Sequence, residues 1–147
     1  ELHDRLAKQG ATLLIKTIEQ VVNGKASRQQ QDKAGVTFAP RLAKETGQIN
    51  WYESATNIIN LIRGLSPTPA AYTFLEGQPL KIFTASPLTA AIIQQPGTIG
   101  VISASGLPVA ASDGYVLLKD VRLTGKKRMP IADFLRGYRL PPGNILG

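Results

Sequence analysis

The spacing of apolar residues changes at Ala71, and this change constrains the fold of the chain more than any other feature. Beyond it, apolar and polar residues alternate, which is the pattern of β-strands with one buried face. Glycine, proline and aspartate turns divide the alternating region into five short strands, over residues 71–75, 80–85, 97–103, 107–111 and 115–123. Short strands in such close succession favour a small β-barrel over a sandwich, because closure leaves fewer unpaired edges.

Three other segments have the spacing of an amphipathic helix, with apolar residues three and four positions apart. Their apolar stripes are Leu14, Ile15, Ile18 and Val22 in the first, Ala55, Ile58, Ile59 and Ile62 in the second, and Ile131, Phe134, Leu135 and Tyr138 in the third. We place the start of the second helix near Asn50 and that of the third at Pro130. A further short strand is predicted over residues 36–39. The fold class expected is therefore mainly β with flanking helices.

The chain divides into three parts by composition. Residues 25–35 contain no large apolar side chain, which is typical of an exposed connector. We expect an isolated amphipathic helix in residues 1–24, a basic linker in residues 25–35, and a domain from residue 36 to residue 147. The helix has no obvious partner surface, and the chain opens on Glu1 rather than on methionine. Both observations predict that this chain is part of a longer protein.

Charge is distributed unevenly along the chain. There are 17 lysine and arginine residues against 10 aspartate and glutamate residues, a net charge of +7. The excess lies in residues 25–63 and 125–147, which flank a neutral centre that holds most of the predicted strands. A β core with such a basic surface suits a polyanion such as RNA. Ordinary solubilising charge is the alternative.

Composition excludes several classes of chemistry. With no cysteine and a single histidine, His3, the chain has no thiol nucleophile, no cysteine zinc site and no cage of several histidines. The carboxylates show no spacing that pairs two of them, and Gly125-Lys126 lacks the other residues of a phosphate-binding loop. We therefore expect no catalytic, cofactor-binding or metal-binding residue here. No apolar run spans a membrane and no leader is evident, so we expect a cytoplasmic protein without a membrane partner.

The strongest candidate for binding is a run of three cations, Lys126, Lys127 and Arg128, between the last long strand and the last helix. Adjacent side chains cannot all face the core, so at least two must reach solvent, where they either meet phosphate or only solubilise a turn. The strand aromatic residues alternate as core residues do, which favours contact with a nucleic-acid backbone over stacking on bases. These aromatic residues are Tyr72, Phe74, Phe83 and Tyr115.

Four stretches of the chain carry a resemblance to a known family. They are Glu1-Leu2-His3-Asp4 with residues 6–11, Ala39-Pro40-Arg41-Leu42 through Ile49-Asn50-Trp51, residues 62–67 through Ala70-Ala71-Tyr72, and Gly125-Lys126-Lys127-Arg128-Met129 with Asp133-Phe134-Leu135. In this order they resemble the C-terminal part of the methionyl-tRNA formyltransferase family, over essentially the whole chain.

The resemblance implies an enzyme that transfers a formyl group from 10-formyltetrahydrofolate to the amino group of methionyl initiator tRNA. In that family the folate and the catalytic residues belong to an N-terminal domain, so this chain by itself is expected to be non-catalytic. Residues 1–24 would be the closing helix of that domain, and residues 36–147 an OB-like barrel that helps to hold the tRNA. The full-length protein is expected to be a monomer.

The candidate tRNA-binding residues follow from the basic segments and the resemblance together. Contacts with the phosphate backbone are expected from Lys25, Arg28, Lys33, Arg41, Lys44, Lys126, Lys127 and Arg128. Two alternatives remain: a stand-alone OB-type RNA-binding module, and an accessory domain of a related sugar-nucleotide formyltransferase. The unpartnered first helix counts against the former, and the basic segments would have no purpose in the latter.

Overall fold

The computed structural model describes residues 2–88, 90, 94–103 and 106–147. The chain separates into two compact units, Glu1–Pro40 and Arg41–Gly147. The first contains the predicted helix, α1 (Leu2–Val22), and a short 3₁₀ turn, η1 (Lys33–Gly35). Every described side chain of α1 is exposed to solvent. The strand predicted over residues 36–39 is wrong: these residues contain no strand, because no segment that the structure describes pairs with their backbone.

The first helix ends where the sequence predicts, at Asn23-Gly24. The Gly24 amide donates to the Val21 carbonyl at 3.1 Å, and the Lys25 amide donates to the Gln20 carbonyl at 2.8 Å. Gly24 has a φ of 65°, a left-handed conformation that glycine adopts without the steric cost of a side chain. These features make a Schellman motif, which satisfies carbonyls that the last helical turn leaves free.

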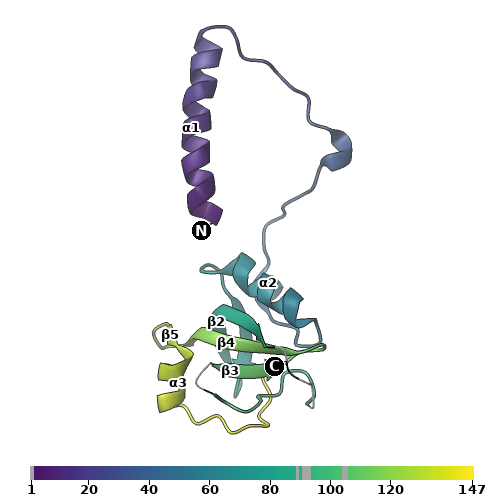
Figure 1. Cartoon of the computed structure of the whole chain (residues 1–147), viewed down its shortest axis with the longest axis vertical. Helices are drawn as coiled ribbons and strands as arrows, with labels where there is room; N and C mark the ends of the chain where they lie inside the picture. The colour runs from purple at the N-terminus through teal and green to yellow at the C-terminus, as the bar shows by residue number, and fades with distance from the viewer. Residues whose placement is uncertain (1, 89, 91–93, 104–105) are drawn as a thin grey trace. The chain divides into compact units, whose positions relative to one another are not determined.

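The second unit is built on a five-stranded sheet whose neighbouring strands pair in antiparallel fashion (Figure 1). Its strands are β1 (Ala71–Leu75), β2 (Gln78–Leu88), β3 (Leu107–Ala110), β4 (Tyr115–Leu123) and β5 (Met129–Pro130). They lie in the order β1-β2-β4-β3, with β5 paired to β4. The predicted hairpin between β1 and β2 is confirmed, and its turn is the pair Glu76-Gly77, both with positive φ. Positive φ at both positions fits the twist of a two-residue hairpin.

The continuous strand predicted over residues 97–103 is wrong. Isolated bridges join Thr98 to Ile145, Ile99 to Val109, and Ser103 to Gly106. The last residue extends this set, since the Gly147 amide donates to the Phe74 carbonyl of β1 at 3.1 Å. The arrangement observed is thus helices with an antiparallel five-stranded sheet, to which the segments around Thr98 and Ile145 are linked by single bridges.

Helices and 3₁₀ turns complete the second unit: η2 (Lys44–Gly47), α2 (Ala55–Leu65) and α3 (Ile131–Gly137). Figure 1 shows α2 across the sheet and α3 beside β4 and β5. Helix α2 contacts β1, β2 and β4, and helix α3 contacts β4 and β5. The second helix begins five residues later than the predicted Asn50, because Asn50 instead closes a turn by accepting from the Tyr52 amide at 3.1 Å. The third helix begins at Ile131, with Pro130 as its N-cap rather than its first residue.

The core lies between α2 and the sheet. Ile58 and Ile62 of α2 pack with Leu80 and Ile82 of β2 in one cluster of buried residues. The prediction that all four strand aromatic residues belong to the core is only half right. Phe83 and Tyr115 are buried, but Tyr72 and Phe74 are half-buried. On β1 they alternate with the buried Ala71, Thr73 and Leu75, so they lie on the outer face.

Candidate nucleic-acid interface

The eight predicted cations are all exposed, but they fall in different units. Three belong to the first unit: Lys25, Arg28 and Lys33. The other five belong to the second unit: Arg41, Lys44, Lys126, Lys127 and Arg128. Within the second unit the structure brings together the last three, in the segment that connects β4 to β5.

One of these three cations, Arg128, has its charge compensated. Its Nε and Nη2 atoms both donate to Oδ2 of Asp120, at 2.8 and 2.5 Å. The pKa of the Arg128 guanidinium is raised, mainly by this hydrogen bond to Asp120. The guanidinium also lies over the ring of Phe83, with its Cζ atom 4.4 Å from the ring centroid. Arg128 is therefore held against the sheet, unlike Lys126 and Lys127, for which the described residues provide no side-chain hydrogen bond or ion pair.

A β-bulge sets the position of Phe83. In the pairing of β2 with β4, Ile82 is opposite Val121 and Thr84 is opposite Asp120, so Phe83 is an extra residue of β2. Bulges of this kind redirect a side chain and increase the local twist. The Phe83 ring also meets a second guanidinium, that of Arg122, whose Cζ atom lies 5.6 Å from its centroid.

Two cations of the second unit, Lys81 and Arg122, were not among the predicted residues. They are directly opposite each other on β2 and β4, and both are on the outer face of the sheet. Together with the turn after β4 they surround a hollow of about 280 Å³. We call this site the basic hollow; its lining residues are Lys81, Arg122, Thr124, Gly125 and Lys126.

Hydrogen bonds hold the walls of the basic hollow in place. The Thr124 amide and hydroxyl both donate to the Pro79 carbonyl, at 3.1 and 3.0 Å, which fastens the end of β4 to the start of β2. The Lys126 amide donates to the Leu123 carbonyl at 3.0 Å, which closes the turn. The ammonium of Lys81 donates to the Pro69 carbonyl at 2.9 Å. These bonds fix the backbone of the turn and the ammonium of Lys81 beside a space that Arg122 and Lys126 also line.

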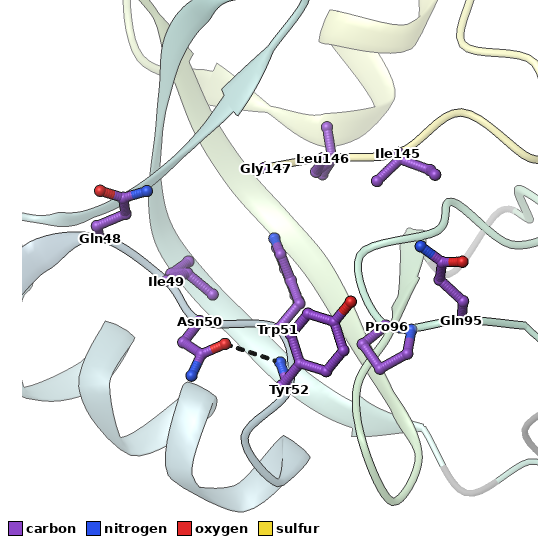
Figure 2. Close-up of a pocket in the computed structure, with 10 residues that line it drawn as sticks. All are labelled: Gln48, Ile49, Asn50, Trp51, Tyr52, Gln95, Pro96, Ile145, Leu146 and Gly147. Atoms are coloured by element: carbon purple, nitrogen blue, oxygen red, sulfur yellow. Dashed lines mark hydrogen bonds between the residues drawn. The ribbon is translucent and has the colours of Figure 1, made fainter.

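A second hollow, of about 430 Å³, has a different chemical character. Figure 2 shows the side chains around it, with the rings of Trp51, Tyr52 and Pro96 near one another. The remaining lining residues are Gln48, Ile49, Asn50, Gln95, Ile145, Leu146 and Gly147. None of these side chains carries a charge, so the hollow offers no cation to neutralise a phosphate group. It is lined by amides and apolar groups and is not the candidate interface.

Metal-binding and membrane-spanning features are not found in the part of the chain that the structure describes. Within it, no three histidine, cysteine, aspartate or glutamate side chains lie close enough together to hold a metal ion. Among the same residues, no helix has the length and apolarity needed to cross a membrane. The candidate site is therefore the set of exposed cations, of which those around the basic hollow are the best positioned.

Comparison with known proteins gives one family match and many relatives. Residues 41–139 match the family described as "Formyl transferase, C-terminal domain". A methionyl-tRNA formyltransferase from Syntrophus aciditrophicus is 46% identical over 146 residues, which are 99% of this chain and 47% of that protein. The methionyl-tRNA formyltransferase from Moorella thermoacetica is 42% identical over 147 residues, again 47% of its length. The chain thus spans about half the length of the curated relatives it matches.

Solved structures agree on the fold. HypX from Aquifex aeolicus is similar with a TM-score of 0.64 and 18% sequence identity, over 88% of this chain and 24% of that one. A second structure of HypX, in complex with tetrahydrofolic acid, gives a TM-score of 0.63 over 83% of this chain. At this level of identity the likeness concerns the fold alone.

Proposed function

Because the chain belongs to the formyl transferase C-terminal domain family, we propose that it is the tRNA-binding part of a methionyl-tRNA formyltransferase. The observation that carries the proposal is the 46% identity to such an enzyme along nearly the whole chain. The complete enzyme would transfer the formyl group of 10-formyltetrahydrofolate to the amino group of methionyl initiator tRNA. Since this step prepares initiator tRNA for translation, we place the enzyme in the cytoplasm, and we expect it to act as a monomer.

The parts of the chain take distinct roles in this proposal. Helix α1, within residues 1–24, closes the N-terminal catalytic domain, which corresponds to the half of the relatives that this chain does not cover. Residues 25–35 form the linker, and residues 36–147 form the domain that holds the tRNA. The exposed apolar side chains of α1 support its assignment to another domain, because such a patch normally marks an interface.

We propose that the sheet closes into an OB-like barrel. The bridges from Ile99 to Val109 and from Thr98 to Ile145 continue the sheet beyond β3. The hydrogen bond from the Gly147 amide to the Phe74 carbonyl then links the C-terminal end of this extended sheet to β1. In this arrangement closure depends on single bridges instead of full ladders, and it removes the free edges of β1 and β3.

The tRNA contact that we propose is electrostatic and acts through phosphate groups. The eight predicted cations are exposed, as phosphate-binding side chains must be, and seven of them have no ion pair among the described residues. Contacts of this kind position a nucleic acid without reading its sequence. Selection of initiator tRNA over other tRNAs would then depend on the catalytic domain.

The proposal is tested by formyl transfer to methionyl initiator tRNA with 10-formyltetrahydrofolate as donor. The 147-residue chain alone should show no turnover, and the protein extended upstream by its catalytic domain should be active. Turnover by the chain alone would contradict the assignment of catalysis to the missing domain. An extended protein that formylates a sugar nucleotide instead would support the accessory-domain alternative, and a coding sequence with no upstream domain would support the stand-alone module.

Replacement of Lys126 and Lys127 by alanine should weaken binding of initiator and elongator tRNA equally. Each phosphate that is no longer neutralised should also reduce the slope of log K against log salt concentration by about 0.7 to 0.9, because fewer counterions are released. Filter binding or fluorescence anisotropy at several salt concentrations measures both quantities. The control is Arg63→Ala with Lys119→Ala, which removes the same charge from exposed positions outside the candidate set. Weakened binding of only one of the two tRNAs would mean readout of bases or shape.

A further inference from the structure

We propose that the basic hollow is a dedicated site for a single phosphate group of the tRNA backbone, held jointly by Lys81, Arg122 and Lys126. This inference rests on the proposed function and deepens it, since it adds one built site to the dispersed surface charge. Lys81 and Arg122 lie in strands β2 and β4, outside the two basic segments, residues 25–63 and 125–147.

The pairing of Lys81 with Arg122 favours an anion between them. Like charges directly opposite each other on neighbouring strands repel, and they destabilise a sheet. No carboxylate among the described residues forms an ion pair with either of them or with Lys126. Repulsion of this kind is relieved when an anion lies between the two cations. A phosphodiester of the tRNA backbone carries one negative charge and two non-bridging oxygens, which accept hydrogen bonds from lysine and arginine side chains.

Two cations of the basic hollow, Lys81 and Arg122, are preorganised. Lys81 is anchored by its bond to the Pro69 carbonyl and keeps two further N–H donors. The guanidinium of Arg122 rests against the Phe83 ring. The two bonds from Thr124 to Pro79 and the bond from Lys126 to Leu123 fix the turn. Lys81 and Arg122 therefore lose little conformational freedom when they bind, whereas the exposed side chain of Lys126, on a fixed turn, becomes ordered on binding.

Asp120, the acidic residue that could compete for Arg122, is engaged through its Oδ2 atom, while its Oδ1 atom is buried with no hydrogen-bond partner among the described residues. It lies two residues from Arg122 on the same strand, which places both side chains on the same face. Both bonds from Arg128 go to Oδ2 of Asp120. Arg128 thus neutralises Asp120, and Arg122 remains available to a ligand. Arg128 acts here as a positioning residue, because it holds Asp120 away from Arg122 and does not contact the phosphate bound in the basic hollow.

The slope of log K against log salt concentration for tRNA binding separates one shared phosphate from three independent contacts. The 147-residue chain is compared with the variant Arg122→Gln and with the triple variant Lys81→Gln, Arg122→Gln and Lys126→Gln. A single shared phosphate predicts that the slope of the triple variant falls by only about 0.7 to 0.9, and that Arg122→Gln alone already produces most of this decrease. The control Lys119→Gln, on the same strand as Arg122, should leave the slope unchanged. Thermal unfolding verifies that each variant is folded.

A second measurement does not depend on tRNA. Pyrophosphate is titrated into ¹⁵N-labelled chain, and the amide signals of Gly125 and Lys126 are followed by NMR. These signals should shift and saturate in the unmodified chain and in Lys119→Gln, and they should stay in place in Arg122→Gln.

Each combination of outcomes decides between the two claims. A decrease in slope about three times larger in the triple variant than in Arg122→Gln overturns the shared site while tRNA binding stands. Unchanged slopes together with unshifted amide signals also overturn it. If the chain binds no tRNA but pyrophosphate shifts the two amides, the phosphate site is supported and the proposed function fails. If neither ligand binds, both claims fail.

Discussion

At the scale of single residues, the ability of a cation to bind an anion depends on whether a neighbouring carboxylate already pairs with it. Arg128 is one of three consecutive cations in the sequence, yet only Arg128 is paired with Asp120 and stacked on Phe83. Its neighbours Lys126 and Lys127 stay exposed. Residues that are equivalent in a charge count therefore have different roles in the folded chain.

The role of Arg128 is tested by combining it with its partner. Arg128→Gln should weaken tRNA binding about fivefold, the equivalent of ~1 kcal/mol, because the freed Asp120 carboxylate then pairs with Arg122. Adding Asp120→Asn should restore most of the affinity, since no charge is left to compete. Fluorescence anisotropy with tRNA measures the cycle. A double variant as weak as Arg128→Gln would mean that Arg128 itself contacts the phosphate.

Gly97 is a position where the backbone admits no side chain. Its φ is 87°, and a Cβ atom built there would lie 2.7 Å from the Leu146 carbonyl oxygen. Gly97→Ala should therefore cost the left-handed conformation, about 1 to 2 kcal/mol, and a further ~1 to 3 kcal/mol for the displaced C-terminal segment. Gly125→Ala is the matched control, because Gly125 has a φ of 76° and open space around it. Urea unfolding should show a clearly larger destabilisation for Gly97→Ala, and equal destabilisation would contradict the clash.

At the scale of elements, the N-terminus of α2 is capped both by its own N-cap residue and by the turn between β3 and β4. Ser54 is its N-cap and accepts from the Asn57 amide at 3.2 Å. Asp113, in the turn between β3 and β4, accepts from the Ala55 amide at 2.7 Å. The Ser112 amide in the same turn donates to the Glu53 carbonyl. The turn thus completes the cap of a helix that is distant in the sequence, and its negative charge suits the helix dipole.

Removal of this second cap should be measurable. Asp113→Ala should reduce the free energy of unfolding by about 1 to 2 kcal/mol, because it leaves the Ala55 amide without its acceptor. Asp133→Ala is a control of the same type, since Asp133, in the first turn of α3, caps no amide of the described residues and forms an exposed ion pair with Arg136, worth about 0 to 1 kcal/mol. Its exposed interaction with the helix dipole contributes a similar amount, about 0.3 to 1 kcal/mol. Urea denaturation monitored by circular dichroism compares the two. Similar small decreases would show that Ser54 caps the helix sufficiently by itself.

At the scale of the whole molecule, the two units differ in what they bury. The second unit has a continuous core, whereas α1 buries none of its described residues. Its exposed large apolar side chains are Leu2, Leu6, Leu13, Leu14, Ile15, Ile18, Val21 and Val22. Full burial of one such side chain is worth about 1.5 to 3 kcal/mol, so the exposed set has a strong tendency to associate with another surface.

Deletion of residues 1–24 tests this difference. The thermal midpoint of the remaining chain should change little, because the helix contributes no buried residue to the core. Self-association at high concentration should decrease, since the apolar patch is removed. Calorimetry measures the first quantity and sedimentation velocity the second. Unfolding of the shortened chain would mean that α1 belongs to the core of the second unit.

Much of the secondary structure follows from local sequence patterns. The bounds of β1 and β4 agree with the predicted ranges, and α1 ends at Val22, directly before the predicted stop at Asn23-Gly24. Predicted boundaries were wrong where a polar side chain competed with regular structure, as Asn50 does before α2. They were also wrong where a strand lacked a continuous partner, as in residues 97–103.

The candidate site could be predicted only in part. Lys126 and Lys127 were found because consecutive cations must reach solvent. Lys81 and Arg122 were missed, although period two alone places each on an outer face. Nothing in either strand shows that the two are opposite each other, because that depends on the register between strands.

The sequence by itself therefore determined most of the helical and extended segments, and that the consecutive cations after β4 reach solvent. These properties depend on the repeat of a helix or strand, which is local covalent geometry. The tertiary structure alone decided that Lys81 faces Arg122, that a bulge turns Phe83 towards two guanidinium groups, and that Asp113 caps α2. Each of these contacts joins segments far apart in the chain, so it exists only once the strands have paired and the core has closed around them.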